Sequence, residues 1–103
     1  MKYLVSRLYI GADNETHELD TDKIARLVSE KFQGFTLTTG QGFYNGTPEQ
    51  CAIVTVAQAE LDKYHRKEYP EGLKGIIKKF AAKLAEDLDQ ECIMVESTWS
   101  DVE

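Results

Sequence analysis

The sequence predicts an α+β fold: a ferredoxin-like βαββαβ sandwich, in which two helices cover one face of a four-stranded antiparallel sheet. Three observations support this prediction. The expected elements follow the order β-α-β-β-α-β, and the expected strands alternate between apolar and polar residues. The chain has 103 residues, 42% hydrophobic and 29% charged, which suits a single soluble ferredoxin-like domain over residues 1–103.

The first half of the chain predicts a strand, a helix and a second strand. Residues 3–10 are rich in aromatic and β-branched types and end before Gly11, which is typical of a strand. Apolar residues recur at helical spacing over residues 21–33, which predicts an amphipathic helix. Asp20, directly before this range, or Thr21, its first residue, can cap the helix. Residues 35–39 alternate between apolar and polar side chains, so we expect the second strand there.

Residues 40–57 predict a hairpin. The Asn45-Gly46 pair is a strong turn signal, because both residue types tolerate positive φ. Residues 51–57 are mostly apolar and β-branched and predict the third strand. Since Gly40 and Gly42 stand between the two expected strands, we expect a bulge or a bend at these glycines.

The second half completes the pattern. We expect a short helical turn over Ala59–Lys67, a long amphipathic helix over residues 71–89, a fourth strand over residues 92–97 and a short polar tail. This architecture has the strand order 4-1-3-2. Cys51 and Cys92 then begin strands that are not neighbours, so we expect two free, buried cysteines rather than a disulfide.

Composition and charge argue against several classes of protein. The 18 acidic and 12 basic residues give a net charge of -6, so there is no basic stripe for nucleic acid. There is no apolar run of the roughly 18 residues that a membrane span needs, and the N-terminus lacks the features of a signal peptide. Two cysteines are too few for a disulfide scaffold, so we expect a cytoplasmic protein.

The acidic excess is concentrated in one ten-residue stretch. This stretch predicts a solvated loop before a helix, and the alternative is a surface for a basic partner. It does not match a calcium loop, because the turn glycine and the final glutamate are missing. The acidic residues are Asp13, Glu15, Glu18, Asp20 and Asp22.

One face of the predicted sheet is left open by the helices. Alternation puts these residues on the covered face: Leu4, Leu8, Ile10, Leu37, Val54, Val56, Ile93 and Val95. The open face then carries Tyr3, Val5, Arg7, Tyr9, Thr36, Thr38, Cys51, Ile53, Thr55, Cys92, Met94 and Glu96. This set is too apolar for a wholly solvated face, so we expect a homo-oligomer. Its interface candidates are Tyr3, Val5, Tyr9, Ile53 and Met94.

The sequence holds no nucleophile motif, phosphate-binding loop or dinucleotide-binding glycine pattern. We therefore expect no catalytic residue, metal ligand or cofactor. RNA binding through stacked tyrosines is disfavoured, because Arg7 is the only basic residue beside them. The candidates for binding a small ligand are Gly40, Gln41 and Gly42, whose backbone N–H groups suit an anion, together with Tyr44 and Arg7.

The segment Gly34-Phe35-Thr36-Leu37-Thr38, followed by Gly40-Gln41-Gly42, resembles the second strand of PII-like signalling proteins. The element order and the closing Ile93-Met94-Val95 strand are similar too. PII-like proteins are trimers that bind nucleotides or other small effectors between subunits and control other proteins by contact. The resemblance therefore implies an effector cleft near residues 40–42.

Three functional hypotheses follow. The first is a non-enzymatic, homo-oligomeric protein that binds a small effector or a protein partner. The second is an acidic inhibitor that occupies a basic or nucleic-acid-binding site on another protein. The third is a small dimeric α+β barrel enzyme, in which Tyr3, Arg7, Tyr9 and Glu96 line a cavity between two open sheet faces.

Overall fold

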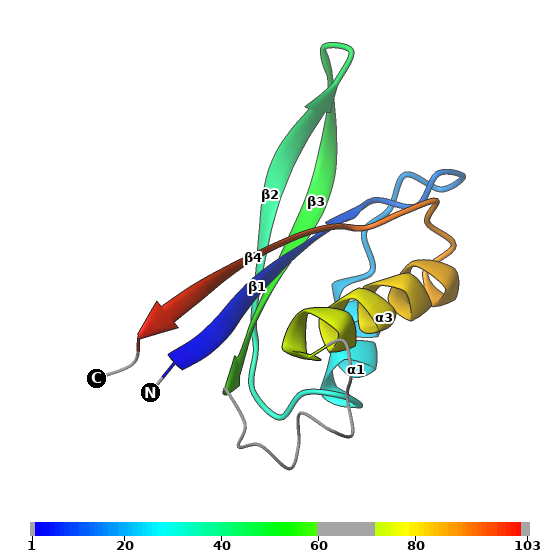
Figure 1. Cartoon of the computed structure of the whole chain (residues 1–103). Helices are drawn as coiled ribbons and strands as arrows, with labels where there is room; N and C mark the ends of the chain where they lie inside the picture. The colour runs from blue at the N-terminus through cyan, green and yellow to red at the C-terminus, as the bar shows by residue number, and fades with distance from the viewer. Residues whose placement is uncertain (1, 60–71, 102–103) are drawn as a thin grey trace.

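The computed structural model describes residues 2–59 and 72–101. Within these two ranges the elements are β1 (Lys2–Gly11), α1 (Thr21–Ser29), β2 (Thr36–Tyr44), β3 (Thr47–Ala59), α3 (Gly72–Asp87) and β4 (Met94–Asp101). The strands form one sheet in the order β2-β3-β1-β4, and every neighbouring pair is antiparallel. Both helices lie on the same side of this sheet (Figure 1), so the predicted ferredoxin-like α+β fold is confirmed.

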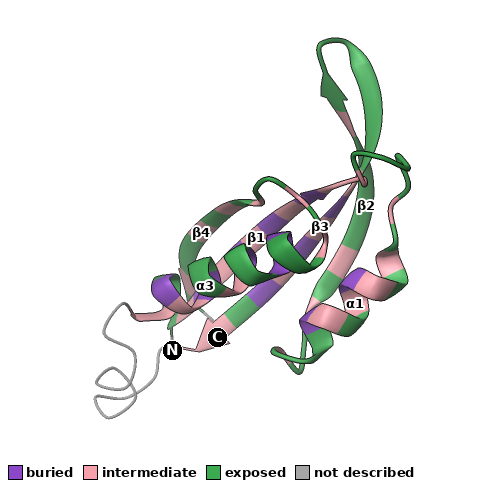
Figure 2. Cartoon of the chain, turned by 90° about the vertical axis from the view of Figure 1, so that its right-hand side faces the viewer, coloured by how far each residue is buried: buried purple, intermediate pink, exposed green. Residues whose placement is uncertain are grey.

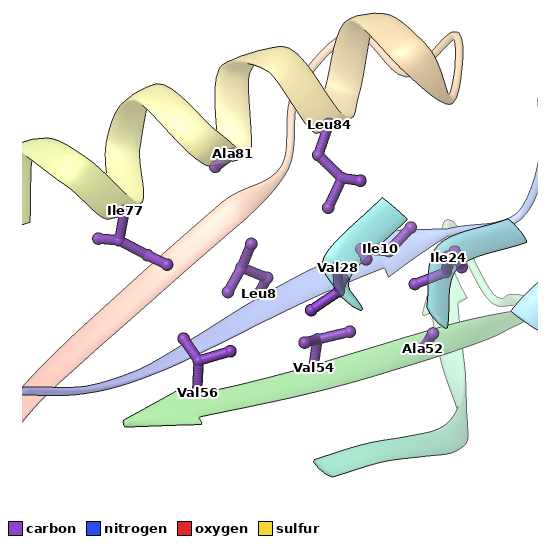
Figure 3. Packing of buried hydrophobic residues seen from close by; sticks show 10 residues of the cluster. All are labelled: Leu8, Ile10, Ile24, Val28, Ala52, Val54, Val56, Ile77, Ala81 and Leu84. Carbon is purple, nitrogen blue, oxygen red and sulfur yellow. The ribbon is translucent and has the colours of Figure 1, made fainter. Parts of the chain in front are cut away.

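The core lies between the helices and the covered face of the sheet (Figure 3). The central strands β1 and β3 supply most of its sheet residues, because each has a strand on both sides. As predicted, Leu4, Leu8, Ile10, Val54 and Val56 are buried. Toward the edges burial is incomplete, and Leu37, Ile93 and Val95 are only partly buried. From the helices come Ile24, Val28, Ile77, Ala81 and Leu84.

The first helix ends four residues before its predicted end. Asp20 caps it as expected, since its side chain accepts a hydrogen bond from the N–H of Lys23 at 3.0 Å. At the other end, the hydroxyl of Ser29 donates to the carbonyl of Ala25 at 2.6 Å, which competes with regular helical geometry. Phe32 lies beyond the helix, where its ring packs edge-on against Phe80 with centroids 5.1 Å apart.

The second helix ends where Asp89 takes a left-handed conformation with φ of 54°. The N–H of Gln90 donates to the carbonyl of Ala85 at 2.8 Å, so this carbonyl in the last turn of the helix has a hydrogen-bond partner. The side-chain amide of Gln90 then donates to the carbonyl of Ala12 at 3.2 Å. Except for Ala59, which belongs to β3, the predicted turn over Ala59–Lys67 lies outside the described residues.

Strands β2 and β3 are longer than predicted. The hairpin turn is at Asn45 and Gly46, as expected, and both residues have positive φ. The expected bulge is wrong: residues 36–44 pair one-to-one with residues 55–47, and this register runs straight through Gly40 and Gly42. The ladder is continuous because both glycines lie outside the left-handed region, so regular strand geometry suits them.

The final strand also differs from its prediction, since β4 begins at Met94 and runs to Asp101. The expected polar tail is therefore largely an edge strand, paired with β1 as far as Lys2. The strand order does separate β3 from β4, and both cysteines are free as predicted. The prediction of burial is wrong for Cys92, which precedes β4 and is exposed, whereas Cys51 is partly buried. No helix in the described part of the chain is long and apolar enough to cross a membrane.

Candidate ligand site on the open sheet face

The register of the sheet shows which open-face side chains are neighbours. Side chains directly opposite one another in an antiparallel pair project from the same face. Arg7 on β1 lies between Glu96 on β4 and Thr55 on β3. One row further along, Tyr9 lies between Met94 and Ile53. Because side chains alternate along β1 and β3, the two rows project from the face opposite the one on which Leu8 and Val54 pack against the helices.

Arg7, Tyr9 and Glu96 form a polar cluster in these rows. The hydroxyl of Tyr9 donates to Oε1 of Glu96 at 2.5 Å. The same carboxylate oxygen lies 3.7 Å from Nη1 of Arg7. The side chains of Arg7 and Glu96 are 44% and 53% exposed, so the ion pair is accessible to solvent and to a ligand. An ion pair this exposed contributes little to the stability of the fold. We therefore consider a role for it in binding.

The hydrogen bond to Glu96 raises the pKa of Tyr9 above the usual range for tyrosine. Desolvation and the negative charge of Glu96 raise this pKa further, while the positive charge of Arg7 lowers it. Tyr9 therefore keeps its proton at neutral pH and holds the carboxylate in place as a hydrogen-bond donor. The arrangement presents one cation, one anion and an aromatic ring side by side.

The predicted interface candidates surround this cluster. Tyr3, Val5 and Ile53 share the open face and are partly buried. Met94 lies directly opposite Tyr9 and is 62% exposed. The open face is thus a mainly apolar surface with a polar centre, as the alternation of the strands indicated.

The glycine candidates lie at a different place. Gly40 pairs with Cys51 on β3, and Cys51 pairs in turn with Gly11 on β1. It is thus four residues beyond Arg7 and two strands away, about 13 Å along the strands and about 10 Å across them. Since β3 separates β1 from β2, Arg7 does not join Gly40, Gln41, Gly42 and Tyr44 in one site within the chain. Their role in binding an effector stays a prediction.

Glu96 was missing from the sequence-based ligand candidates, although the sequence analysis placed it on the open face and in the cavity of the barrel hypothesis. Its partner Tyr9 is 87 residues away in the sequence, and they meet diagonally across β1 and β4. The alternation of both strands indicated that they share a face. The register that brings them into contact depends on long-range pairing, which local patterns do not specify.

The acidic stretch folds back on itself. Oδ1 of Asp13 accepts from the N–H of Glu15 at 2.7 Å and from the N–H of Thr16 at 2.9 Å. These hydrogen bonds, the one from Thr16 first, lower the pKa of Asp13 below its usual range. Across residues 2–59 and 72–101, no three histidine, cysteine, aspartate or glutamate side chains gather in a way that could hold a metal ion. The part of the stretch before α1 is thus a loop that Asp13 organises, in line with the solvated loop before a helix that its charge predicts.

Comparison with solved structures gives one clear likeness of fold. No protein-family model matches the sequence, and no curated protein matches it. The fold is similar to that of a phage SAM lyase in complex with S-methyl-5′-thioadenosine. The TM-score is 0.69, at 16% identity over 93% of this chain and 80% of that one. A phage SAM lyase in the apo state gives a TM-score of 0.48 at 20% identity, over 97% of this chain and 86% of that one. The resemblance to PII-like proteins stays a prediction.

Proposed function

We propose that the protein binds a small effector as a homo-oligomer and that the effector contacts Arg7, Tyr9 and Glu96. The observation that carries this proposal is the hydrogen bond of 2.5 Å between Tyr9 and Glu96 at the centre of the open face. Binding sites typically combine apolar contact area with a few polar groups that orient the ligand. Here the half-buried apolar residues around the cluster supply the contact area, and the cluster supplies the polar groups.

The cluster suits a ligand with a positive charge next to an apolar or aromatic body. The carboxylate of Glu96 attracts a cation, and the ring of Tyr9 provides an aromatic surface beside it. Met94 adds a polarisable thioether across from that ring. Arg7 can donate to a carboxylate or another acceptor on the same ligand. SAM (S-adenosylmethionine) has all of these features, and the phage enzyme that shares this fold is named for it.

The homo-oligomer accounts for the apolar character of the open face. A single copy leaves this face without cover, and contact between copies would bury its apolar rim while enclosing the polar centre. We also place the protein in the cytoplasm, since the free thiols of Cys51 and Cys92 fit a reducing compartment.

The experiment is a calorimetric titration with SAM and with S-methyl-5′-thioadenosine. We expect saturable binding to the wild type, and a dissociation constant at least ten-fold higher for Glu96→Gln. The matched control is Glu86→Gln, which removes a carboxylate from an exposed position on α3 and should bind like the wild type. Equal affinity of all three proteins would contradict the proposed site, and absence of binding by the wild type would contradict the proposed ligand class.

A lyase that acts on SAM is the second candidate function. It is favoured by the carboxylate of Glu96, which Tyr9 holds and which can serve as a base. In such an elimination the base removes a proton from the carbon β to sulfur, a C=C bond forms as the C–S bond breaks, and S-methyl-5′-thioadenosine leaves. Incubation with SAM, followed by chromatography for S-methyl-5′-thioadenosine, separates the two functions. Product that forms with the wild type and is lost in Glu96→Gln would favour the lyase. Binding without product would favour the effector-binding protein.

A further inference from the structure

One row of side chains on the open face is polar along its whole length and is called the polar row below. In Figure 2 the two helices lie in front of the sheet, so the open face is turned away from the viewer. From β2 to β4, the members of the polar row are Thr36, Thr55, Arg7 and Glu96. On the central strands the neighbouring rows are apolar or aromatic, with Val5 and Ala57 in one row and Tyr9 and Ile53 in the other. The polar row therefore concentrates the hydrogen-bonding groups of this face in one line.

The two charged members of this row can make further contacts. Within residues 2–59 and 72–101, the carboxylate of Glu96 is contacted at Oε1, by the hydroxyl of Tyr9 and by Nη1 of Arg7, so Oε2 can accept from a ligand. A guanidinium has five N–H donors, and the contact with Glu96 involves Nη1. Since an exposed ion pair of 3.7 Å is weak, a ligand can extend or replace it at little cost.

A cation and an anion this close together complement a ligand group that carries both charges. An α-amino acid head group has an ammonium and a carboxylate on the same carbon atom. Its ammonium can donate to Glu96, while its carboxylate accepts from Arg7. A ligand with a single charge would engage one member of the pair and leave the other without a new partner, so the pair favours the head group with two charges.

Thr55 adds a neutral donor on the other side of Arg7. It lies directly opposite Arg7 and is partly buried, and side chains paired in this way have Cβ atoms about 5 Å apart. Its hydroxyl can therefore donate to the same carboxylate as the guanidinium. The rest of the ligand then extends over the row of Tyr9 and Met94, two residues or about 7 Å along the strands. Head group and body thus contact different rows.

We propose that the polar row binds an α-amino acid head group of the ligand, with the ammonium on Glu96 and the carboxylate on Arg7 and Thr55. This inference rests on the proposed function, since it assumes that the ligand contacts the open face. It goes further by naming the part of the ligand that the charged pair recognises. It also gives Thr55, which the cluster of Arg7, Tyr9 and Glu96 does not include, a role in selecting ligands that carry this head group.

The test is calorimetric titration with three probes. SAM carries the head group and a sulfonium charge, S-adenosylhomocysteine carries the head group without that charge, and S-methyl-5′-thioadenosine lacks both. We expect the wild type to bind SAM and S-adenosylhomocysteine about ten-fold more tightly than S-methyl-5′-thioadenosine. Thr55→Val removes the hydroxyl and keeps the branched shape, so it should weaken S-adenosylhomocysteine about five-fold and leave S-methyl-5′-thioadenosine unchanged. Arg7→Gln should have the same selective effect.

The matched control is Thr38→Val, which removes a hydroxyl from the same face outside the polar row. The hydroxyl of Thr38 donates to the carbonyl of Ile53 at 3.4 Å, and this variant should bind all three probes like the wild type. Unchanged binding of S-methyl-5′-thioadenosine by Thr55→Val also shows that this variant is folded.

The outcomes separate this inference from the proposed function. Equal affinity of the wild type for S-adenosylhomocysteine and S-methyl-5′-thioadenosine overturns the head-group inference, and so does wild-type affinity of Thr55→Val for S-adenosylhomocysteine. Binding of SAM without binding of S-adenosylhomocysteine also overturns it, because the sulfonium charge is then what the protein recognises. In these three cases the proposed function stands. A wild type that binds none of the probes overturns both.

Discussion

Ser6 and Ser97 face each other across β1 and β4, and their hydroxyl oxygens are 2.7 Å apart. Ser6 is fully buried on the covered face, between Leu4 and Leu8. It is the buried polar residue of the described core. One hydroxyl donates to the other, so each of the two polar groups has a hydrogen-bond partner beside the apolar layer.

Replacing one member of this pair should destabilise the fold. We expect Ser6→Ala to lower the free energy of unfolding by about 1–2 kcal/mol, because Ser97 loses its partner in a partly buried position. The double variant Ser6→Ala/Ser97→Ala should recover part of this loss, since neither hydroxyl then remains unpaired. Urea denaturation of the four proteins measures the coupling, and strictly additive losses would contradict it.

Tyr9 should ionise at unusually high pH. Because the folded pKa of Tyr9 is raised, chiefly by its hydrogen bond to Glu96, the stabilising contribution is fully present below the pKa of an unfolded tyrosine, about 10. It is lost as the pH rises through the higher folded pKa. In an alkaline titration followed by tyrosinate absorbance, Tyr9→Phe should remove a component that titrates above the usual range of tyrosine. Glu96→Gln should move that component to lower pH, and an unchanged titration would argue against the hydrogen bond.

The glycines of the hairpin should respond differently to alanine. Gly46 has a φ of 77°, so Gly46→Ala should cost about 1–2 kcal/mol of stability through backbone strain. A Cβ at Gly40 would lie 3.7 Å from Sγ of Cys51, which is an ordinary contact. Gly40→Ala should therefore leave thermal stability unchanged or slightly raised. A loss of stability in Gly40→Ala comparable to that in Gly46→Ala would contradict this account.

Gly40→Ala also tests the predicted effector site at residues 40–42. Because neither its φ nor its neighbours require glycine, the substitution separates binding from folding. Weaker effector binding by a fully stable Gly40→Ala protein would support a close backbone approach by the ligand. Unchanged binding would restrict the site to Arg7, Tyr9 and Glu96.

Asp13 should titrate below the usual range of an aspartate. Its folded pKa is lowered by the N–H groups of Thr16 and Glu15. Its stabilising contribution is therefore present above the unfolded pKa of about 3.9 and is lost as the pH falls through the folded value. The difference in stability between the wild type and Asp13→Asn should accordingly shrink below about pH 4. Carboxyl chemical shifts measure the pKa directly, and a value at or above the ordinary one would contradict the prediction.

Much of the fold could be predicted because it depends on local periodicity. Alternation along residues 3–10 and 51–57 identified the covered face, and Leu8 and Val54 are indeed buried there. Helical spacing identified Ile24, Val28 and Ile77 as core residues. The Asn45-Gly46 turn followed from the tolerance of both residues for positive φ. In each case the physical cause acts over a few residues and is visible in the sequence.

Element ends and the candidate site were harder to predict. The first helix ended at Ser29, four residues before the end of its apolar periodicity, and there the hydroxyl of Ser29 donates to the carbonyl of Ala25. The strand β4 extended to Asp101 because β1 offered it a partner as far as Lys2, although the segment is polar. The length of the β2–β3 hairpin was missed for a related reason: residues 40–50 contain turn-forming types, yet pairing across the hairpin keeps most of them extended.

The sequence by itself determined the order of the elements, the face that each strand buries and the position of the hairpin turn. These depend on periods of about two and 3.6 residues and on local backbone preferences. Only the tertiary structure decided that Tyr9 reaches Glu96, that Arg7 lies far from Gly40, and that the β2–β3 hairpin continues past the last row that β3 shares with β1, at Gly11 and Cys51. The reason is that strand order and register arise from backbone pairing between segments far apart in the chain, and no local pattern encodes such pairing.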